Sequence, residues 1–214
     1  MRKIRIGSYY RSKILQTINM ADHFDRVLDV GSHDGYLLSF FPDSFKIAVD
    51  IALPNQRLAH PFVLADAKAL PFVNDSFDLV LLMDVIEHIE DESGLAESLA
   101  RILTKEGRLV LSTPSAEISM FPGFLTRSIS IQWGHIFRLG YTSENLRSLF
   151  ENNFSLKIEN WNAPFFRFFY LPVKLISLLS SRLAFSFLDK IAIYDANHKA
   201  GVHGYHLLKG RARK

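Results

Sequence analysis

The chain has 214 residues, of which 48% are hydrophobic and 22% are charged, as in an ordinary folded domain and unlike a disordered chain. It contains no cysteine, which excludes a disulfide framework, a cysteine-ligated zinc ion and a cysteine nucleophile. The formal net charge of +3 is uneven, with −4 on residues 1–164 and +7 on residues 165–214. The basic part predicts contact with an anionic surface, either lipid headgroups or a phosphorylated substrate.

The first half alternates short apolar runs with helical patterns, which predicts βα units and a mostly parallel sheet. Its expected strands are Arg26–Val30, Lys46–Val49, Pro61–Leu64, Phe77–Met83 and Arg108–Ser112. Its expected helices are Gly35–Phe41 and Asp91–Leu103, the second closed by Gly107.

The second half is less regular. Ser115–Gly140 is rich in Phe, Gly and Ser and predicts a long irregular segment, of the kind that forms lids or binding loops. Thr142 is a suitable N-cap for a helix that runs to about Asn152. Strands are then expected at Phe154–Trp161 and Gly201–Leu208.

An apolar segment, Phe165–Leu188, lies between these last two strands. It is interrupted by Arg167, Pro172, Lys174 and Arg182. A membrane-spanning helix with spaced cations would be costly, and both flanking strands must join one sheet, so we expect no span. Two alternatives remain for the insertion at 165–199. Its apolar face covers the acceptor pocket or a homodimer interface, or it lies in a membrane interface with its cations at the headgroups.

Polar residues follow the first three strands. The first strand ends in Asp29-Val30-Gly31-Ser32, and Gly35 opens the next helix. Glycine lets a ligand approach the backbone, and the amides at a helix start are free donors. Asp50, at the end of the second strand, is placed to accept hydrogen bonds from ribose hydroxyls. Asp66-Ala67, after the third strand, could accept one from an adenine amino group.

Together these motifs resemble the class I S-adenosylmethionine-dependent methyltransferases, from about Val27 to Ser112. The matching stretches are the acid–glycine loop, Asp50, the DA…LPF…SFD segment 66–78, the EHI segment 87–89 and residues 101–114. The resemblance implies a single domain, 1–214, with a Rossmann-like doubly wound α/β sheet of seven strands and a helical apolar insertion before the last strand. It also implies S-adenosylmethionine as the cofactor, bound by Asp29, Gly31, Ser32, Gly35, Asp50, Ile51, Asp66, Ala67 and Asp84.

The loop departs from the family pattern at one position. His33 replaces the middle glycine, and we expect its side chain to point outward and leave the site intact. The alternative of a dinucleotide-binding domain requires G-x-G-x-x-G, which residues 31–35 do not supply. The acid Asp29 would also lie close to a pyrophosphate, whereas S-adenosylmethionine carries an ammonium group and no phosphate.

Methyl transfer mainly requires alignment of the acceptor and exclusion of water. His88 and His135 are the candidate catalytic residues, because histidine can act as a base near neutral pH. A helix from Tyr9 to Ile18 is expected to cover the cofactor, with Tyr10 in a packing role. We expect no metal ion in the site.

The sequence therefore predicts methyl transfer to a small-molecule, glycan or lipid-linked acceptor. The alternative is a non-catalytic cofactor-binding or scaffold module that binds a partner or membrane through the insertion. We expect no nucleic-acid substrate, because the basic residues alternate with aliphatic rather than stacking side chains. The basic N-terminus lacks a following apolar run, which predicts a cytoplasmic protein, peripheral at the inner face of the membrane if the insertion contacts lipid.

Overall fold

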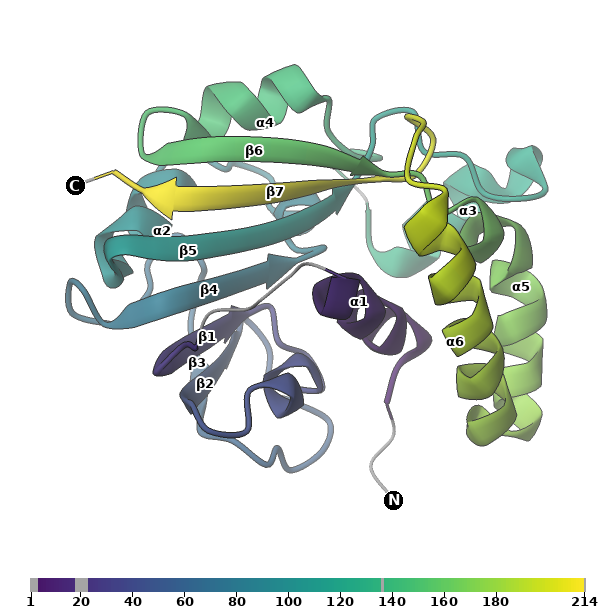
Figure 1. Cartoon of the computed structure of the whole chain (residues 1–214), viewed down its shortest axis with the longest axis horizontal. Helices are drawn as coiled ribbons and strands as arrows, with labels where there is room; N and C mark the ends of the chain where they lie inside the picture. The colour runs from purple at the N-terminus through teal and green to yellow at the C-terminus, as the bar shows by residue number, and fades with distance from the viewer. Residues whose placement is uncertain (1–3, 18–22, 136, 214) are drawn as a thin grey trace.

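The computed structural model describes residues 4–17, 23–135 and 137–213. Seven strands form one sheet in the order β3-β2-β1-β4-β5-β7-β6 (Figure 1). The first five in this order are parallel, and β7 runs antiparallel to both β5 and β6. The strands are β1 Arg26–Val30, β2 Phe45–Asp50, β3 Phe62–Leu64, β4 Phe77–Met83, β5 Leu103–Pro114, β6 Phe154–Trp161 and β7 Tyr205–Ala212. The predicted seven-stranded α/β fold is confirmed.

Helices cover both faces of this sheet. The α-helices are α1 Ile6–Thr17, α2 Leu95–Ile102, α3 Thr126–Trp133, α4 Ser143–Phe150, α5 Pro164–Leu179 and α6 Ser181–Asn197. Short 3₁₀ turns are η1 Leu37–Phe40, η2 Ile86–His88 and η3 Gly123–Leu125.

The alternation of side chains along β4 separates two apolar cores. Leu79, Leu81 and Met83 join the core that includes residues of α1, α5 and α6. Val80 and Leu82 join the other core, which includes residues of α2 and α4. All five side chains are almost fully buried, as expected for a central parallel strand covered on both faces.

Four sequence predictions about local structure were wrong. The helix expected at Gly35–Phe41 is only the 3₁₀ turn η1, because Gly35 adopts a positive φ and Pro42 follows directly. Gly107 does not close a helix. Helix α2 ends at Ile102, and Gly107 lies inside β5, where the pairing with β4 shifts register.

The other two differences lie in the second half. The segment expected to be irregular, Ser115–Gly140, contains η3 and α3. The last strand begins at Tyr205 rather than Gly201, because the chain first turns tightly against Asn162. At Gly204 a Cβ would lie 2.2 Å from the Asn162 carbonyl oxygen. The N-cap predicted at Thr142 is confirmed, with its hydroxyl accepting from the Asn145 amide at 3.1 Å.

The apolar insertion is a hairpin of two helices, α5 and α6, between β6 and β7, as predicted. In Figure 1 it stands on the side toward which β4 and β5 point. Within the described ranges, no helix has the length and apolarity needed to cross a membrane. The predicted N-terminal helix is α1, which ends at Thr17; Ile18 lies outside the described residues.

Candidate functional site

The acids predicted to bind the cofactor gather at one edge of the sheet. Asp29 lies near the end of β1, Asp50 ends β2, Asp66 lies two residues after β3, and Asp84 directly follows β4. These four strands are neighbours in the order β3-β2-β1-β4, and all are parallel. In open α/β sheets the crevice at the carboxyl ends of the strands is where ligands bind. The topology therefore brings the predicted cofactor residues to the edge that this fold uses for ligands.

The glycine loop after β1 has little space around it. Gly31 has a φ of +74°, and a Cβ there would lie 2.2 Å from Cγ2 of Val85. Gly35 also has a positive φ, and its amide donates to the Ser32 carbonyl at 2.7 Å. His33 adopts a φ of +46° with its side chain exposed. The outward orientation expected for His33 is thus found.

Asp50 also holds this loop in place. Its Oδ2 accepts a hydrogen bond from the His33 amide at 3.0 Å, and its Oδ1 accepts one from Ala52 at 3.2 Å. A carboxylate has about four lone-pair sites, so Asp50 keeps capacity for ribose hydroxyls. The side chain of Ile51 is 74% exposed, which leaves an apolar surface beside Asp50.

Asp66 and Ala67 lie one strand further along. Asp66 is exposed, and its Oδ1 accepts from the Lys68 amide at 2.9 Å. Ala67 is half-buried and packs against the core on the α2 side. Their contact with an adenine ring stays a prediction.

Asp29 and Ser32 are buried polar residues, and each has a side-chain oxygen without a hydrogen-bond partner in the described part of the chain. Asp29 is 1% exposed, and neither its Oδ2 nor the Ser32 hydroxyl has a hydrogen-bond partner among the described residues. Burial, reinforced by the charge of Asp34, raises the pKa of Asp29 to about 8. A buried carboxylate with an unsatisfied oxygen suits a cationic ligand. This feature fits S-adenosylmethionine, which would place its ammonium group in this part of the site.

Asp84 links β4 to the N-terminal helix. Its Oδ2 accepts from Nε of Arg11 in α1 at 2.6 Å, and its Oδ1 accepts from the Ser112 hydroxyl in β5. Asp84 also has a φ of +52°, which redirects the chain sharply after the strand. Arg11 could not be predicted as the partner of Asp84 from local patterns, because the two residues are 73 positions apart.

Beyond Asp84 the structure brings together both predicted histidines. The rings of His88 and His135 have centroids 5.0 Å apart, although the two residues come from η2 and the segment after α3. His88 is exposed and its Nδ1 lies 3.1 Å from the Gly134 carbonyl oxygen. His135 is 7% exposed. A third residue, Glu87, completes this cluster.

Glu87 is fully buried, and its Oε1 lies 3.6 Å from Nε2 of His135. That distance would suit an ion pair but is too long for a hydrogen bond. Burial raises the pKa of Glu87 and lowers that of His135 to about 4, so both groups favour their neutral forms in the free protein. Glu87 Oε2 accepts from the Thr113 hydroxyl at 3.0 Å. Residue types alone did not single out Glu87, although the EHI segment that includes it was matched.

Helix α5 of the α5–α6 hairpin packs beside the cluster of Glu87, His88 and His135 through Trp133. The indole N–H of Trp133 donates to the Tyr170 hydroxyl of α5 at 2.7 Å, and the Trp133 ring lies 5.6 Å from that of His135. The inner face of α5 thus lies close to the histidine cluster.

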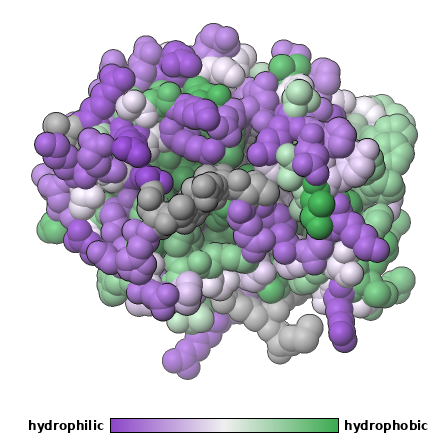
Figure 2. Space-filling model, in the orientation of Figure 1, coloured by the Kyte–Doolittle hydropathy of each residue, from purple (hydrophilic) through white to green (hydrophobic). Residues whose placement is uncertain are grey.

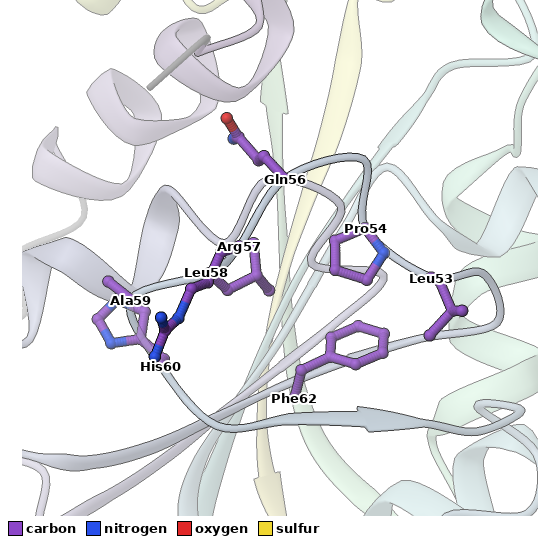
Figure 3. Close-up of a pocket in the computed structure, with 8 residues that line it drawn as sticks. All are labelled: Leu53, Pro54, Gln56, Arg57, Leu58, Ala59, His60 and Phe62. Atoms are coloured by element: carbon purple, nitrogen blue, oxygen red, sulfur yellow. The ribbon is translucent and has the colours of Figure 1, made fainter. Parts of the chain in front are cut away.

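A separate pocket of about 640 Å³ lies at the connection between β2 and β3 (Figure 3). Its lining residues all come from Leu53 to Phe62, and none is a predicted site residue.

Residues 2–163 match a family described as a methyltransferase domain. This match covers well over half of the chain, which therefore belongs to that family. With its sheet order and its acid–glycine loop, the protein is a class I methyltransferase, and S-adenosylmethionine is the cofactor of that class.

Known relatives share only part of this chain. An uncharacterized methyltransferase of Mycolicibacterium vanbaalenii is 35% identical over 97 residues, which are 40% of this chain and 38% of the relative. Tocopherol O-methyltransferase of Arabidopsis thaliana is 36% identical over 104 residues, 41% of this chain and 30% of the relative. The matches therefore span less than half of each protein.

The fold is shared more widely. The structure of Haemonchus contortus phosphoethanolamine N-methyltransferase 2 in complex with S-adenosyl-L-methionine has a TM-score of 0.64 at 16% identity. The superposition covers 96% of this chain and 52% of the Haemonchus contortus chain. At this identity the likeness concerns the fold.

Proposed function

We propose that this protein transfers a methyl group to an apolar small molecule or lipid-linked acceptor while docked on a membrane surface. The exposed apolar turn of the α5–α6 hairpin is the observation that carries this proposal. Bound S-adenosylmethionine would supply an activated methyl group on its sulfonium. The protein's own contribution would be to align the acceptor between the carboxyl ends of β4 and β5 and the inner face of α5, and to exclude water.

The hairpin has two different faces. Phe166, Tyr170 and Val173 of α5 are buried in the core shared with α1. Near the turn, by contrast, leucine side chains are largely exposed: Leu175 64%, Leu178 77%, Leu179 91% and Leu183 64%. Figure 2 shows hydrophobic surface on this side of the molecule. Contiguous exposed apolar groups of this kind mark contact with a partner or a membrane.

The charges beside the leucines favour lipid over a second protein. Arg182 is exposed next to Leu183, and the two hairpin helices, Pro164–Asn197, carry a net charge of +2. Apolar side chains flanked by cations match an interface in which the cations meet anionic headgroups. The relative named for tocopherol is consistent with an apolar acceptor.

The two predicted catalytic histidines border the proposed acceptor space, but a base role suits His135 poorly. Its lowered pKa, about 4, makes a neutral imidazole that accepts a proton weakly near pH 7. We infer that His135 acts on the acceptor by positioning it rather than by removing its proton, while a base role for His88 stays a prediction.

Vesicle sedimentation tests the docking. Wild-type protein should sediment with vesicles that contain anionic lipid and remain in solution with neutral vesicles. The double variant Leu178→Glu, Leu179→Glu should lose at least tenfold in binding, because two exposed apolar groups that would insert into the lipid are replaced by acids. Val73→Glu is the matched control, since Val73 is 79% exposed and precedes the amino end of β4, away from the hairpin. Equal binding by the double variant and wild type would overturn the docking.

Transfer of labelled methyl groups from S-adenosylmethionine to membrane lipid extract tests the reaction. Label should appear in the organic phase with wild type. Label confined to water-soluble products would contradict an apolar acceptor. No product from any cell extract, together with normal cofactor binding, would favour the scaffold alternative.

A further inference from the structure

Glu87, His88 and His135 form a cluster whose chemistry goes beyond the acceptor positioning inferred above for His135. One ligand-capable atom from each side chain lies within 4.8 Å of the others. Glu87 is 0% exposed and His135 7%. Within the part of the chain that is described, Oε1 of Glu87 has no hydrogen-bond partner. Leaving such a buried polar atom unpaired costs free energy, which a bound ligand would recover.

We propose that these three residues bind one divalent transition-metal ion. Two imidazoles and one carboxylate form a ligand set that suits Zn²⁺, Fe²⁺ or Co²⁺, whereas Mg²⁺ and Ca²⁺ prefer oxygen ligands throughout. Three protein ligands also leave coordination positions open, as in catalytic rather than structural metal sites. This proposal departs from the sequence-based expectation of no metal ion, which stays untested.

Surrounding hydrogen bonds orient two of the ligands. The Thr113 hydroxyl donates to Oε2 of Glu87 at 3.0 Å, which leaves Oε1 for the ion. Nδ1 of His88 lies 3.1 Å from the Gly134 carbonyl oxygen, and only a protonated Nδ1 can donate there. The lone pair of that imidazole is then on Nε2. Metal-binding histidines are commonly fixed by such a bond from the other ring nitrogen to a carbonyl.

The cluster must contract slightly to hold an ion. Bonds of about 2.0–2.2 Å place neighbouring ligand atoms roughly 3.5 Å apart around tetrahedral zinc. The 3.6 Å between Glu87 Oε1 and His135 Nε2 already meets this spacing. His88 is exposed and so has freedom to move the remaining distance. An open position would take an acceptor oxygen; that role rests on the proposed methyl transfer, whereas ion binding does not.

Calorimetric titration of Zn²⁺ into the full chain, without an affinity tag and after removal of metal with EDTA, tests the site. No cofactor or acceptor is needed, so its failure is distinguishable from failure of methyl transfer. Wild type should bind one ion per chain, and His88→Ala should weaken binding at least tenfold. His88 is exposed, so this variant should fold.

His203→Ala is the matched control. His203 is also exposed, with its Nδ1 3.1 Å from the Glu117 carbonyl oxygen, but it lies outside the cluster. Loss of the His203 imidazole should leave the affinity for Zn²⁺ unchanged. Co²⁺ gives a second readout, since its visible absorption should intensify on binding to wild type and to His203→Ala but not to His88→Ala. Absence of Zn²⁺ binding by wild type, or equal affinity in His88→Ala, would overturn the proposal.

Discussion

The hydroxyl of Tyr10 in α1 donates a 2.6 Å hydrogen bond to Oδ2 of Asp195 in α6, 185 positions later in the chain. Asp195 is 0% exposed and also accepts from the amides of Phe165 and Phe166, at 2.9 and 3.1 Å. These amides belong to the first turn of α5, whose N-cap residue Ala163 has no capping side chain. A carboxylate from α6 therefore caps α5 and anchors the hairpin to α1.

We expect Asp195→Ala to lower the free energy of unfolding by about 3 kcal/mol, roughly 1 kcal/mol for each buried donor left unpaired. Urea denaturation measures this change. Asp189→Ala is the matched control, since Asp189 accepts from Tyr9 and pairs with Lys13 on the same two helices but is 43% exposed. Asp189→Ala should lower the free energy of unfolding by less than about 1 kcal/mol. Equal costs for the two variants would show that Asp195 is not the anchor.

A second prediction separates backbone strain from close packing in the glycine loop. Gly31 and Gly94 have nearly equal φ values, +74° and +75°. A Cβ at Gly31 would meet Val85 at 2.2 Å, whereas a Cβ at Gly94 has no atom within 4 Å. Gly94→Ala should therefore cost about 1–2 kcal/mol from conformation alone.

Gly31→Ala should cost about 1–3 kcal/mol more, because the loop and Val85 must move apart. Thermal denaturation of both variants gives the comparison, and cofactor titration should show weakened binding for Gly31→Ala alone. Indistinguishable melting temperatures would mean that the loop shifts freely.

The raised pKa of Asp29 predicts a dependence of stability on pH. Between the ordinary value of 3.8 and the folded value of about 8, the folded protein holds a proton on Asp29 that the unfolded chain has lost. Stability from this group is thus complete below the unfolded pKa and is lost as pH rises toward 8. The loss is at most about 1.4 kcal/mol per pH unit.

Asp29→Asn should remove this slope, since an amide does not titrate. Urea denaturation of the cofactor-free protein at pH 5, 6, 7 and 8 measures it. The stability of the variant relative to wild type should increase with pH. Parallel pH profiles for the two proteins would contradict a buried, protonated Asp29.

Cofactor affinity should depend on Asp50. We expect wild type to bind S-adenosylmethionine and S-adenosylhomocysteine, and Asp50→Ala to lose at least tenfold, because both the ribose contacts and the His33 amide bond disappear. Calorimetric titration measures this, with the exposed loop acid in Asp43→Ala as the control. Unchanged affinity in Asp50→Ala would remove Asp50 from the cofactor site.

Local patterns in the sequence were sufficient to predict most of the sheet. The apolar run Phe77–Met83 and the alternating run Phe154–Trp161 match β4 and β6 in both boundaries. Glycine was the main source of error, since the same residue type closes helices, forms bulges and makes tight turns. Gly107 was expected to close a helix and lies at a register shift in β5, and Gly201 was expected to begin the last strand but precedes it with a positive φ.

The acids at the strand ends could be predicted because each lies within two residues of the last residue of its strand. Glu87 and Arg11 could not, since their importance comes from partners that are distant in sequence. Glu87 lies beside Thr113 and His135, and Arg11 pairs with Asp84, 73 positions away. Only the fold brings these groups together.

The bond between Tyr10 and Asp195 also constrains the order in which the protein can be completed during translation. At about 5–20 residues per second, the 185 positions between them take roughly 10–40 s to synthesise. Throughout that interval the apolar side of α1, with Ile14 and Leu15, lacks the helix that later packs on it. The nascent chain therefore offers a hydrophobic surface to chaperones until α6 has left the ribosome.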